Sequence, residues 1–261
     1  MDHAEPTLTQ ASEGIWLVRG GSSNWVIVKD PGGGPSFTLV DGGYVADYPA
    51  LLASMGKLGL RPVDCSAALV THGHVDHIGG LQQFAAEFGV PVLCHADEAP
   101  NLVGPRREQV SLARILPWLW RGRVRSWLQA ALRLRALDPV SITPAAVFRD
   151  HETLDVPGSP MAIHFPGHTS GSSAFLFETD GERVIACGDI AVTAHEALPE
   201  DAVGIQPLPS MFHLDRAAAD ASLDRLMALR PDVLLPGHGP AFLGSRAGLG
   251  LHDRVHDPDQ S

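Results

Sequence analysis

The chain has 261 residues, of which 44% are hydrophobic, so it is long enough to bury a sizeable core as a single domain over residues 1–261. Its formal net charge at pH 7 is −11, which repels polyanions and argues against nucleic acid as a partner. No window reaches the roughly 18 uninterrupted apolar residues of a spanning helix, so a membrane protein is not expected.

The cysteines and the first residues favour a cytoplasmic location. Cys65, Cys94 and Cys187 are odd in number and lack C-x-x-C spacing, which is typical of reduced thiols rather than of a disulfide framework. The opening six residues contain no apolar stretch of the kind found in signal peptides. Cys187 ends an apolar run, so we expect it to be a small core residue rather than a catalytic thiol.

The first 60 residues predict a meander of strands followed by a helix. Strands are expected over residues 14–19, 24–29 and 36–40, and the glycine- and proline-rich stretch before the third strand predicts a turn. Apolar residues at helical spacing then predict a helix over residues 46–58, which ends at Gly59.

Four metal-binding side chains lie within six residues, directly after the apolar run 67–70. His72 and His74 are two residues apart, so on an extended segment they point the same way and can hold one cation. Asp76 and His77 follow where the chain turns into the next helix, so they face a neighbouring position. Neutral imidazole suits zinc, iron and nickel, and a carboxylate widens the choice of metal. This stretch therefore predicts a metal site.

After a helix over residues 78–88 and a strand over 91–95, the composition changes. His95 at the end of that strand is expected to be a core or rim histidine rather than a ligand. The following insertion, around residues 104–138, is basic: between Gly104 and Leu137 it contains eight arginines and only one acid, Glu108. Apolar residues recur in it at helical spacing, and Pro117 interrupts them, which predicts two helices or one kinked helix.

The second half of the chain predicts mainly strands. Short strands are expected over residues 147–148 and 153–156. Three longer strands should follow from Met161, ending at His168, near Phe177 and at Asp189.

A long connection over residues 190–211 precedes the last helix. His195 and His213 flank it and are the spare histidines best placed to reach a substrate, but we expect both to be solvated. The helix is predicted over residues 215–229, with Asp215 as its N-cap.

Three further motifs each follow an apolar run: Pro166–Ser172, Cys187–Asp189 and Pro236–Gly239. Together with the complete H-x-H-x-D-H motif of residues 72–77, they resemble the metallo-β-lactamase superfamily in content and order, over about residues 15–240. The resemblance implies an α+β fold, an αββα four-layer sandwich, with a helical insertion around residues 104–138. The spacing of the residues alone supports only a mixture of helices and strands with the candidate ligands at strand ends.

The resemblance also implies a binuclear metal site. It assigns one ion to His72, His74 and His168, and a second ion to Asp76, His77 and His238, with Asp189 bridging the two. Two divalent ions per chain are expected, with Zn²⁺ as the first choice and iron or manganese as alternatives. Asp41 stands where the family carries an aspartate near the metals; it either orients a ligand histidine or caps a turn.

Three interpretations of the basic amphipathic insertion stay open. Insertions at this place in the superfamily cover the metal cleft, so a lid over the substrate is one interpretation, and three tryptophans would give it apolar bulk. Structural packing or the surface of a homodimer is the second, and a membrane-surface helix is the third. The arginines could also attract an acidic substrate, which favours an acyl-CoA or another acidic thioester.

The expected chemistry is hydrolysis. Two cations a few ångströms apart can share a hydroxide, because each lowers the pKa of bound water from near 16 towards about 7. This metal-bridging hydroxide would attack the carbonyl carbon of a small thioester, ester or lactone, and a metal would stabilise the oxyanion. Asp76 is the candidate to orient the hydroxide as well as a ligand. No general acid for the leaving group is evident, which favours a thioester, and the substrate-binding residues are unknown.

Differences from the patterns of individual subfamilies narrow the choice of function. Asp189 argues against the β-lactamases proper, and the 23 residues after His238 are too few for the glutathione-binding domain of a true glyoxalase II. Lactonases that act on acyl-homoserine-lactone-like signals place a tyrosine just after the bridging aspartate, where this chain has Ile190-Ala-Val-Thr. A glyoxalase-II-like hydrolase of a small acyl compound remains, with such a lactonase or a mononuclear-iron persulfide dioxygenase as alternatives.

Overall fold

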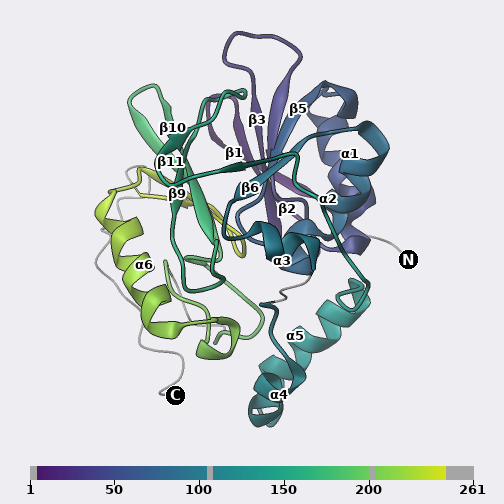
Figure 1. Cartoon of the computed structure of the whole chain (residues 1–261), viewed down its shortest axis with the longest axis vertical. Coiled ribbons are helices and arrows are strands. Elements are labelled where there is room, and N and C mark those ends of the chain that lie inside the picture. Colours follow the sequence, from purple (N-terminus) through teal and green to yellow (C-terminus); the bar gives the residue numbers. More distant parts are fainter. Residues whose placement is uncertain (1–4, 105–107, 200–203, 245–261) are drawn as a thin grey trace.

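A computed structural model of the chain describes residues 5–104, 108–199 and 204–244 (Figure 1). The first part of the chain forms a seven-stranded sheet in sequence order. Its strands are β1 (Thr7–Ser12), β2 (Ile15–Arg19), β3 (Asn24–Lys29), β4 (Phe37–Val40), β5 (Cys65–Leu69), β6 (Val92–His95) and β7 (Ala146–Phe148). Neighbours are antiparallel from β1 to β4 and parallel from β4 to β7. The edge strand β1 was not predicted from the sequence.

The second part forms a six-stranded sheet in the order β13-β12-β11-β10-β9-β8. Its strands are β8 (Glu152–Thr153), β9 (Met161–His164), β10 (Ser173–Thr179), β11 (Glu182–Gly188), β12 (Val233–Pro236) and β13 (Phe242–Leu243). Only the β11–β12 pair is parallel among these described strands. Two predicted bounds were wrong: β8 is shorter than the expected strand 153–156, and β9 ends at His164, so His168 lies in the loop that follows.

Six α-helices and four 3₁₀ helices are present in the described residues. The α-helices are α1 (Tyr48–Lys57), α2 (Val75–Phe88), α3 (Ala99–Val103), α4 (Leu112–Ile115), α5 (Gly122–Arg133) and α6 (Arg216–Ala228). The 3₁₀ helices are η1 (Val45–Asp47), η2 (Pro62–Asp64), η3 (Leu116–Trp118) and η4 (Ser210–Phe212). Asp215 caps α6 as predicted, because its side chain accepts the Ala218 N–H at 3.1 Å.

Alternation of side chains along the strands builds the layers. On β3, Trp25 and Ile27 pack with α1 and α2, whereas Val26 and Val28 face the second sheet. On β10, Phe175 faces the first sheet, while Leu176 packs in the cluster that contains Leu226 of α6. Figure 1 shows α1 and α2 on one flank of the sheets and α6 on the other. The predicted αββα sandwich is therefore confirmed.

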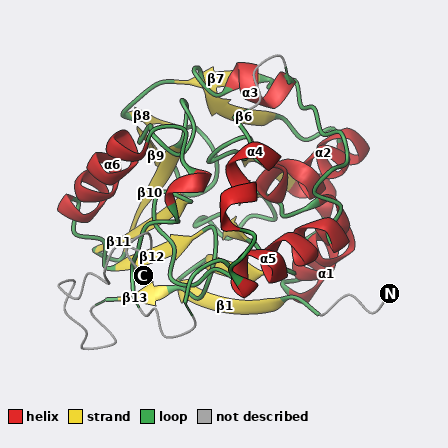
Figure 2. Ribbon diagram, turned by 90° about the horizontal axis from the view of Figure 1, so that it is seen from below, coloured by secondary structure: helices red, strands yellow, loops and turns green. Residues whose placement is uncertain are grey.

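The basic segment forms α4, η3 and α5, with Pro117 inside η3 at the break between the two α-helices. Figure 2, a view from below, shows α4 and α5 between the flank of α6 and the flank of α1 and α2. Of its eight arginines, Arg106 and Arg107 lie outside the described residues. No helix in the described ranges combines the length and apolar character needed to cross a membrane.

Candidate metal centre

The seven candidate ligands come from the ends of strands in both sheets. His72 and His74 follow β5, Asp76 and His77 lie in the first turn of α2, and His168 lies between β9 and β10. Asp189 and His238 follow β11 and β12, two parallel strands whose carboxyl ends lie side by side. All seven side chains gather at one edge of the sandwich, and six of them are less than 10% exposed.

The first group consists of His72, His74 and His168. The Nε2 atom of His168 lies 3.2 Å from Nε2 of His72 and 3.0 Å from Nδ1 of His74. These separations are close to the edges of a tetrahedron whose centre is about 2.0–2.1 Å from each nitrogen, the usual Zn–N distance. The three nitrogens can therefore hold one ion.

The second group consists of Asp76, His77, Asp189 and His238. His238 Nε2 lies 3.4 Å from an oxygen of Asp76 and 3.4 Å from one of Asp189, and His77 Nε2 lies 3.3 Å from the other Asp189 oxygen. The Oδ2 atom of Asp189 is also 3.5 Å from His168 Nε2. Asp189 thus lies between the two groups, at the place where a bridging carboxylate is expected.

Each of the five candidate histidines has one ring nitrogen that faces the other ligands of its group, the inner nitrogen, and one that faces away from them, the outer nitrogen. Each outer nitrogen lies beside an acceptor in the surrounding chain. The contacts are His72 Nδ1 to Thr71 Oγ1, His74 Nε2 to Glu108 O, His77 Nδ1 to Asp41 Oδ2, His168 Nδ1 to His213 Nδ1 and His238 Nδ1 to Ser22 O, at 2.7–3.4 Å. When a neutral ring donates its outer N–H in this way, its inner nitrogen presents a lone pair. Five lone pairs then converge on the same small volume.

Buried atoms without partners support the same conclusion. The Nε2 atoms of His77 and His238 and the Oδ1 atom of Asp189 have no hydrogen-bond partner within the part of the chain that is described. A buried polar atom without a partner is costly, but a cation would satisfy all three at once. The donor set of nitrogens and carboxylate oxygens therefore fits divalent metal ions.

Without a cation, the two groups differ in their protons. Burial, together with repulsion from His77 and the other rings, lowers the pKa of His72 well below its ordinary value, and burial likewise lowers the pKa of His168. Burial also disfavours a charge on His238, but the carboxylates of Asp189 and Asp76 outweigh it and raise the pKa of His238 to about 10. The same balance raises the pKa of His77.

Asp41 contacts the second group directly. Its Oδ2 atom lies 2.9 Å from His77 Nδ1 and accepts the hydroxyl proton of Thr71 at 2.7 Å, while Oδ1 accepts the Thr71 backbone N–H at 2.9 Å. These contacts tie Asp41 to a candidate ligand ring and to Thr71, the residue before His72, so they support the interpretation in which Asp41 orients a ligand histidine. Its φ of 60° belongs to the left-handed region, which aspartate tolerates better than most residues.

The expectation that His213 is solvated was wrong. Its side chain is only 2% exposed, because η4 folds back against the loop that carries His168. His213 Nε2 donates to the Leu208 carbonyl at 3.0 Å, so Nδ1 is left to accept a proton from His168. His213 thereby fixes the tautomer of His168 in which Nε2 presents its lone pair towards His72 and His74.

Glu98 is a buried residue that the sequence analysis did not single out. Its carboxylate accepts hydrogen bonds from the Gly73 and Gly171 N–H groups and from the side chains of Asn101 and Thr169, at 2.6–2.9 Å. Gly73 separates His72 from His74, and Thr169 follows His168. One carboxylate therefore joins the two loops that carry the whole first group.

His95, expected not to be a ligand, is buried and stacks on His164 with ring centroids 4.0 Å apart. With Asp97 these two rings form a third group of donors within 4.8 Å of one another. The ring planes are nearly parallel, at 9°, and a ring nitrogen binds metal within its own plane. One ion cannot lie in both of these parallel ring planes, so the third group lacks the ligand geometry of the other two groups.

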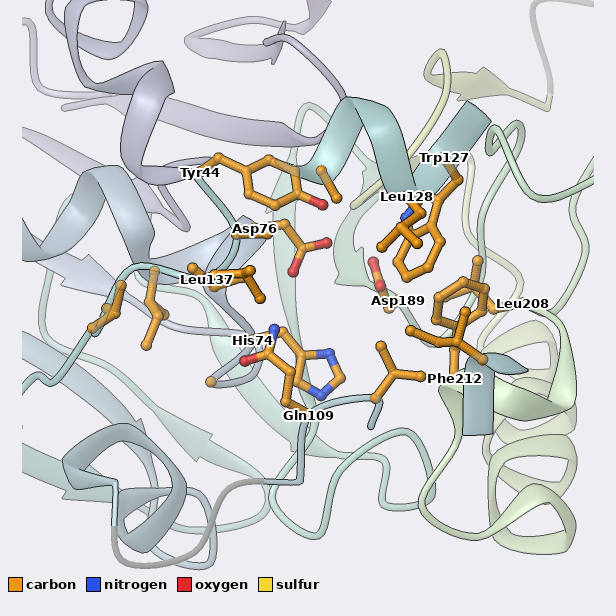
Figure 3. Close-up of a pocket in the computed structure, with 18 of the residues that line it drawn as sticks. Tyr44, His74, Asp76, Gln109, Trp127, Leu128, Leu137, Asp189, Leu208 and Phe212 are labelled. Carbon is orange, nitrogen blue, oxygen red and sulfur yellow. The ribbon is translucent and has the colours of Figure 1, made fainter. Parts of the chain in front are cut away.

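Five of the seven candidate ligands line a cavity of about 310 Å³ that the insertion covers: His74, Asp76, His168, Asp189 and His238. Figure 3 shows Asp76, Asp189 and His74 around this cavity, with Trp127 and Leu128 of α5 also directed into it. The Tyr44 side chain lies beside Asp76 with its hydroxyl directed into the cavity. Burial and then the charges of Asp76, Glu196 and Asp189 raise the pKa of this phenol well above 10, so it stays protonated.

His195 also lines the cavity, and its side chain is half-buried rather than fully exposed. Its Nδ1 atom accepts the Ala197 N–H at 3.0 Å, and its ring centroid is 4.7 Å from that of His238. Burial, together with repulsion from His238, lowers the pKa of His195 to about 4. The ring is therefore neutral near pH 7 and carries its proton on Nε2.

Comparison with known proteins gives one family. Residues 18–238 match the family described as the metallo-beta-lactamase superfamily. The chain is 27% identical over 247 residues to a probable metallo-hydrolase, YflN, of Bacillus subtilis, covering 90% of this chain and 87% of that protein. It is 30% identical over 242 residues to the acyl-coenzyme A thioesterase MBLAC2 of Gallus gallus, covering 89% of this chain and 74% of that protein.

Solved structures agree in fold. A metallo-β-lactamase of Cronobacter sakazakii with a HARLDQ motif superposes with a TM-score of 0.64 at 21% identity, over 90% of this chain and 80% of its own. The native FEZ-1 metallo-β-lactamase of Legionella gormanii gives a TM-score of 0.61 at 18% identity, over the same shares of the two chains.

Proposed function

Because the chain belongs to the metallo-β-lactamase superfamily, we propose that it hydrolyses a small thioester, ester or lactone with two metal ions per chain. The observation that carries the proposal is the convergence of five histidine nitrogens and two carboxylates, five of these seven side chains lining a cavity of about 310 Å³. Every one of these histidines has its outer nitrogen next to an acceptor, as metal-binding histidines do.

His72, His74 and His168 would hold one ion, and Asp76, His77 and His238 the other, with Asp189 between them. Zinc is our first choice, and iron or manganese would suit the same donors. Bound ions of this kind lower the pKa of water towards about 7 and polarise a carbonyl group. The remaining functions fall to the side chains around the cavity.

Asp76 would orient the attacking water. Burial raises the pKa of its carboxyl group, but the charges of His77 and His238 outweigh burial and hold the pKa well below its usual range. The carboxylate is therefore ionised at pH 7, and it lines the cavity. An ionised carboxylate in this position accepts a proton or a hydrogen bond from water.

Tyr44 would donate a hydrogen bond to an oxygen of the substrate. Its phenol is protonated, and it is directed into the cavity from the loop after β4. The sequence showed no proton donor for the leaving group, which favoured a substrate with a thiolate leaving group. Tyr44 supplies such a donor, so oxygen esters and lactones are possible substrates as well. The neutral His195 is a second donor on the same wall.

Two relatives support an acyl substrate. The names of MBLAC2 and of a hydroxyacylglutathione hydrolase of Shewanella pealeana, 25% identical over 199 residues, both describe thioester hydrolases. The Shewanella alignment covers 74% of this chain and 54% of that protein. The three buried, unpaired cysteines support our proposal of a cytoplasmic location.

Elemental analysis of protein purified without added metal tests the proposal first, followed by a panel of thioesters, esters, lactones and phosphodiesters. We expect close to two atoms of zinc, iron or manganese per chain and hydrolysis of at least one acyl compound. One iron per chain with oxygen uptake on a persulfide would instead indicate the dioxygenase. Hydrolysis confined to phosphodiesters would overturn the acyl proposal.

A further inference from the structure

The wall of the cavity opposite the candidate ligands is apolar. Helix α5 presents Trp127, Leu128 and Ala131 to the cavity on one face. The segment that ends in η4 adds Leu208 and Phe212, and the rings of Trp127 and Phe212 meet edge to face at 4.9 Å. Figure 3 shows Trp127, Leu128, Leu208 and Phe212 grouped around the space next to Asp189.

The described arginines of the insertion do not face this space. No lysine or arginine of the described residues lines the cavity. Arg125 donates to the carbonyls of Leu119 and Trp120, Arg121 lies over the rings of Trp118 and Trp120, and Arg114 donates to the His213 carbonyl. These cations hold the insertion together, so they offer no binding site for an acidic substrate inside the cavity.

The geometry points to a substrate with an uncharged, apolar acyl group, which binds between α5 and Phe212 while its carbonyl carbon lies beside Asp76 and Asp189. This inference rests on the proposed hydrolase function and names the substrate class for that same site. A cavity of about 310 Å³ is at the small end of ligand pockets. At about 30 Å³ for each water-sized group, it holds roughly ten non-hydrogen atoms. A short or medium acyl chain fills it.

Leu128 is the residue that we assign to chain-length selection. It is half-buried and lies on the cavity wall, so a larger side chain there shortens the space and a smaller one lengthens it. Gln129, the next residue of α5, is exposed and does not line the cavity. Leu128→Trp and Gln129→Trp therefore form a matched pair that adds the same ring inside and outside the pocket.

The test measures kcat/KM on N-acetylcysteamine thioesters with acyl chains from acetyl to dodecanoyl, using metal-loaded protein. Each buried methylene is worth about 0.8 kcal/mol, so the wild type should gain about fourfold per methylene until the pocket is full. Leu128→Trp should remove this gain for the longer chains, so that its kcat/KM falls much more on dodecanoyl than on acetyl. Leu128→Ala should extend the gain to longer chains, and Gln129→Trp should match the wild type. Equal slopes in all four proteins would overturn the inference while leaving the hydrolase proposal intact.

Calorimetric titration with octanoate and with acetate separates the inference from the hydrolase proposal. Tighter binding of octanoate, lost in Leu128→Trp and kept in Gln129→Trp, supports the apolar pocket even if no thioester is hydrolysed. Equal affinity for octanoate and acetate in all variants would contradict it, whatever the enzyme hydrolyses.

Discussion

The carboxylate of Glu98 lies 2.7 Å from the backbone nitrogen of Gly73, the residue between His72 and His74. Its second oxygen accepts the Gly171 N–H at 2.9 Å, beyond His168 in the chain. The side chain is fully buried, and its four donors come from three separate segments. Glu98 therefore sets the distance between the two loops of the first group.

Glu98→Gln should weaken metal binding by about 10- to 100-fold, as the loss of a partner behind metal ligands commonly does. An amide has only one acceptor oxygen, so its NH₂ group must face the N–H donors of one of the two loops and cannot accept their hydrogen bonds. Competition with a chelator would measure the affinity. Glu178→Gln is the control, because Glu178 is exposed on β10 and should leave the affinity unchanged. Wild-type affinity in Glu98→Gln would show that the two loops hold their positions without it.

Asp189→Asn should cut turnover severely and lower the metal content. The carboxylate lies within 3.5 Å of nitrogens from both groups, so the substitution removes a negative charge that both groups share and replaces one acceptor oxygen with an NH₂ donor. Metal content per chain and kcat would be measured on the same preparation. Unchanged metal content and rate would exclude the bridging role.

Metal loading should release protons from the second group and not from His72 or His168. In the metal-free protein the pKa of His238 is about 10 and that of His77 is also raised, so both rings are protonated at pH 7, whereas His72 and His168 are neutral. Filling the second group should therefore release close to two protons per chain at pH 7, and its affinity should fall as the pH falls. Calorimetry in buffers of different ionisation enthalpy counts these protons. No dependence on the buffer would contradict the prediction.

Tyr44→Phe should lower kcat on oxygen esters by roughly 10²- to 10⁴-fold, the usual contribution of one positioned proton donor. Thioesters of a low-pKa thiol should be affected much less, since a thiolate leaves without a proton. Tyr48→Phe is the matched control, because the Tyr48 hydroxyl bonds to Glu87, away from the cavity. Equal loss on both substrate types would assign Tyr44 to packing.

The sequence alone predicted the features that depend on residues close to one another in the chain. Local patterns predicted most of the strands and helices and the clustering of candidate ligands at residues 72–77. The αββα layers and the division of the ligands into two groups came from the resemblance that this motif and the three later motifs carry. Asp215 was likewise readable, because an N-cap bonds to the residue three positions later.

Glu98, Tyr44 and His213 could not be found in this way. Glu98 follows another acid, Asp97, just before a short helix, and its donors at Gly73 and Gly171 are 25 and 73 residues away. His213 reaches His168 across 45 residues, through a loop with no periodic pattern. Tyr44 follows two glycines and looks like a turn residue until the fold brings Asp76 beside it. The contacts that give these three residues their roles form only when the chain has folded, so no local sequence pattern indicates them.

The division of the ligands between the two sheets has a consequence for the assembly of the protein. His72 and His168 are 96 residues apart, and neither the first half of the chain nor the second contains a complete set of donors. An ion therefore closes a long loop, as a cross-link would, and can be captured only after the two sheets have docked. Chelation should consequently loosen the seam between the halves before it loosens either sheet. Amide hydrogen exchange should then rise first at the carboxyl ends of β5 and β11, with the centres of both strands still protected.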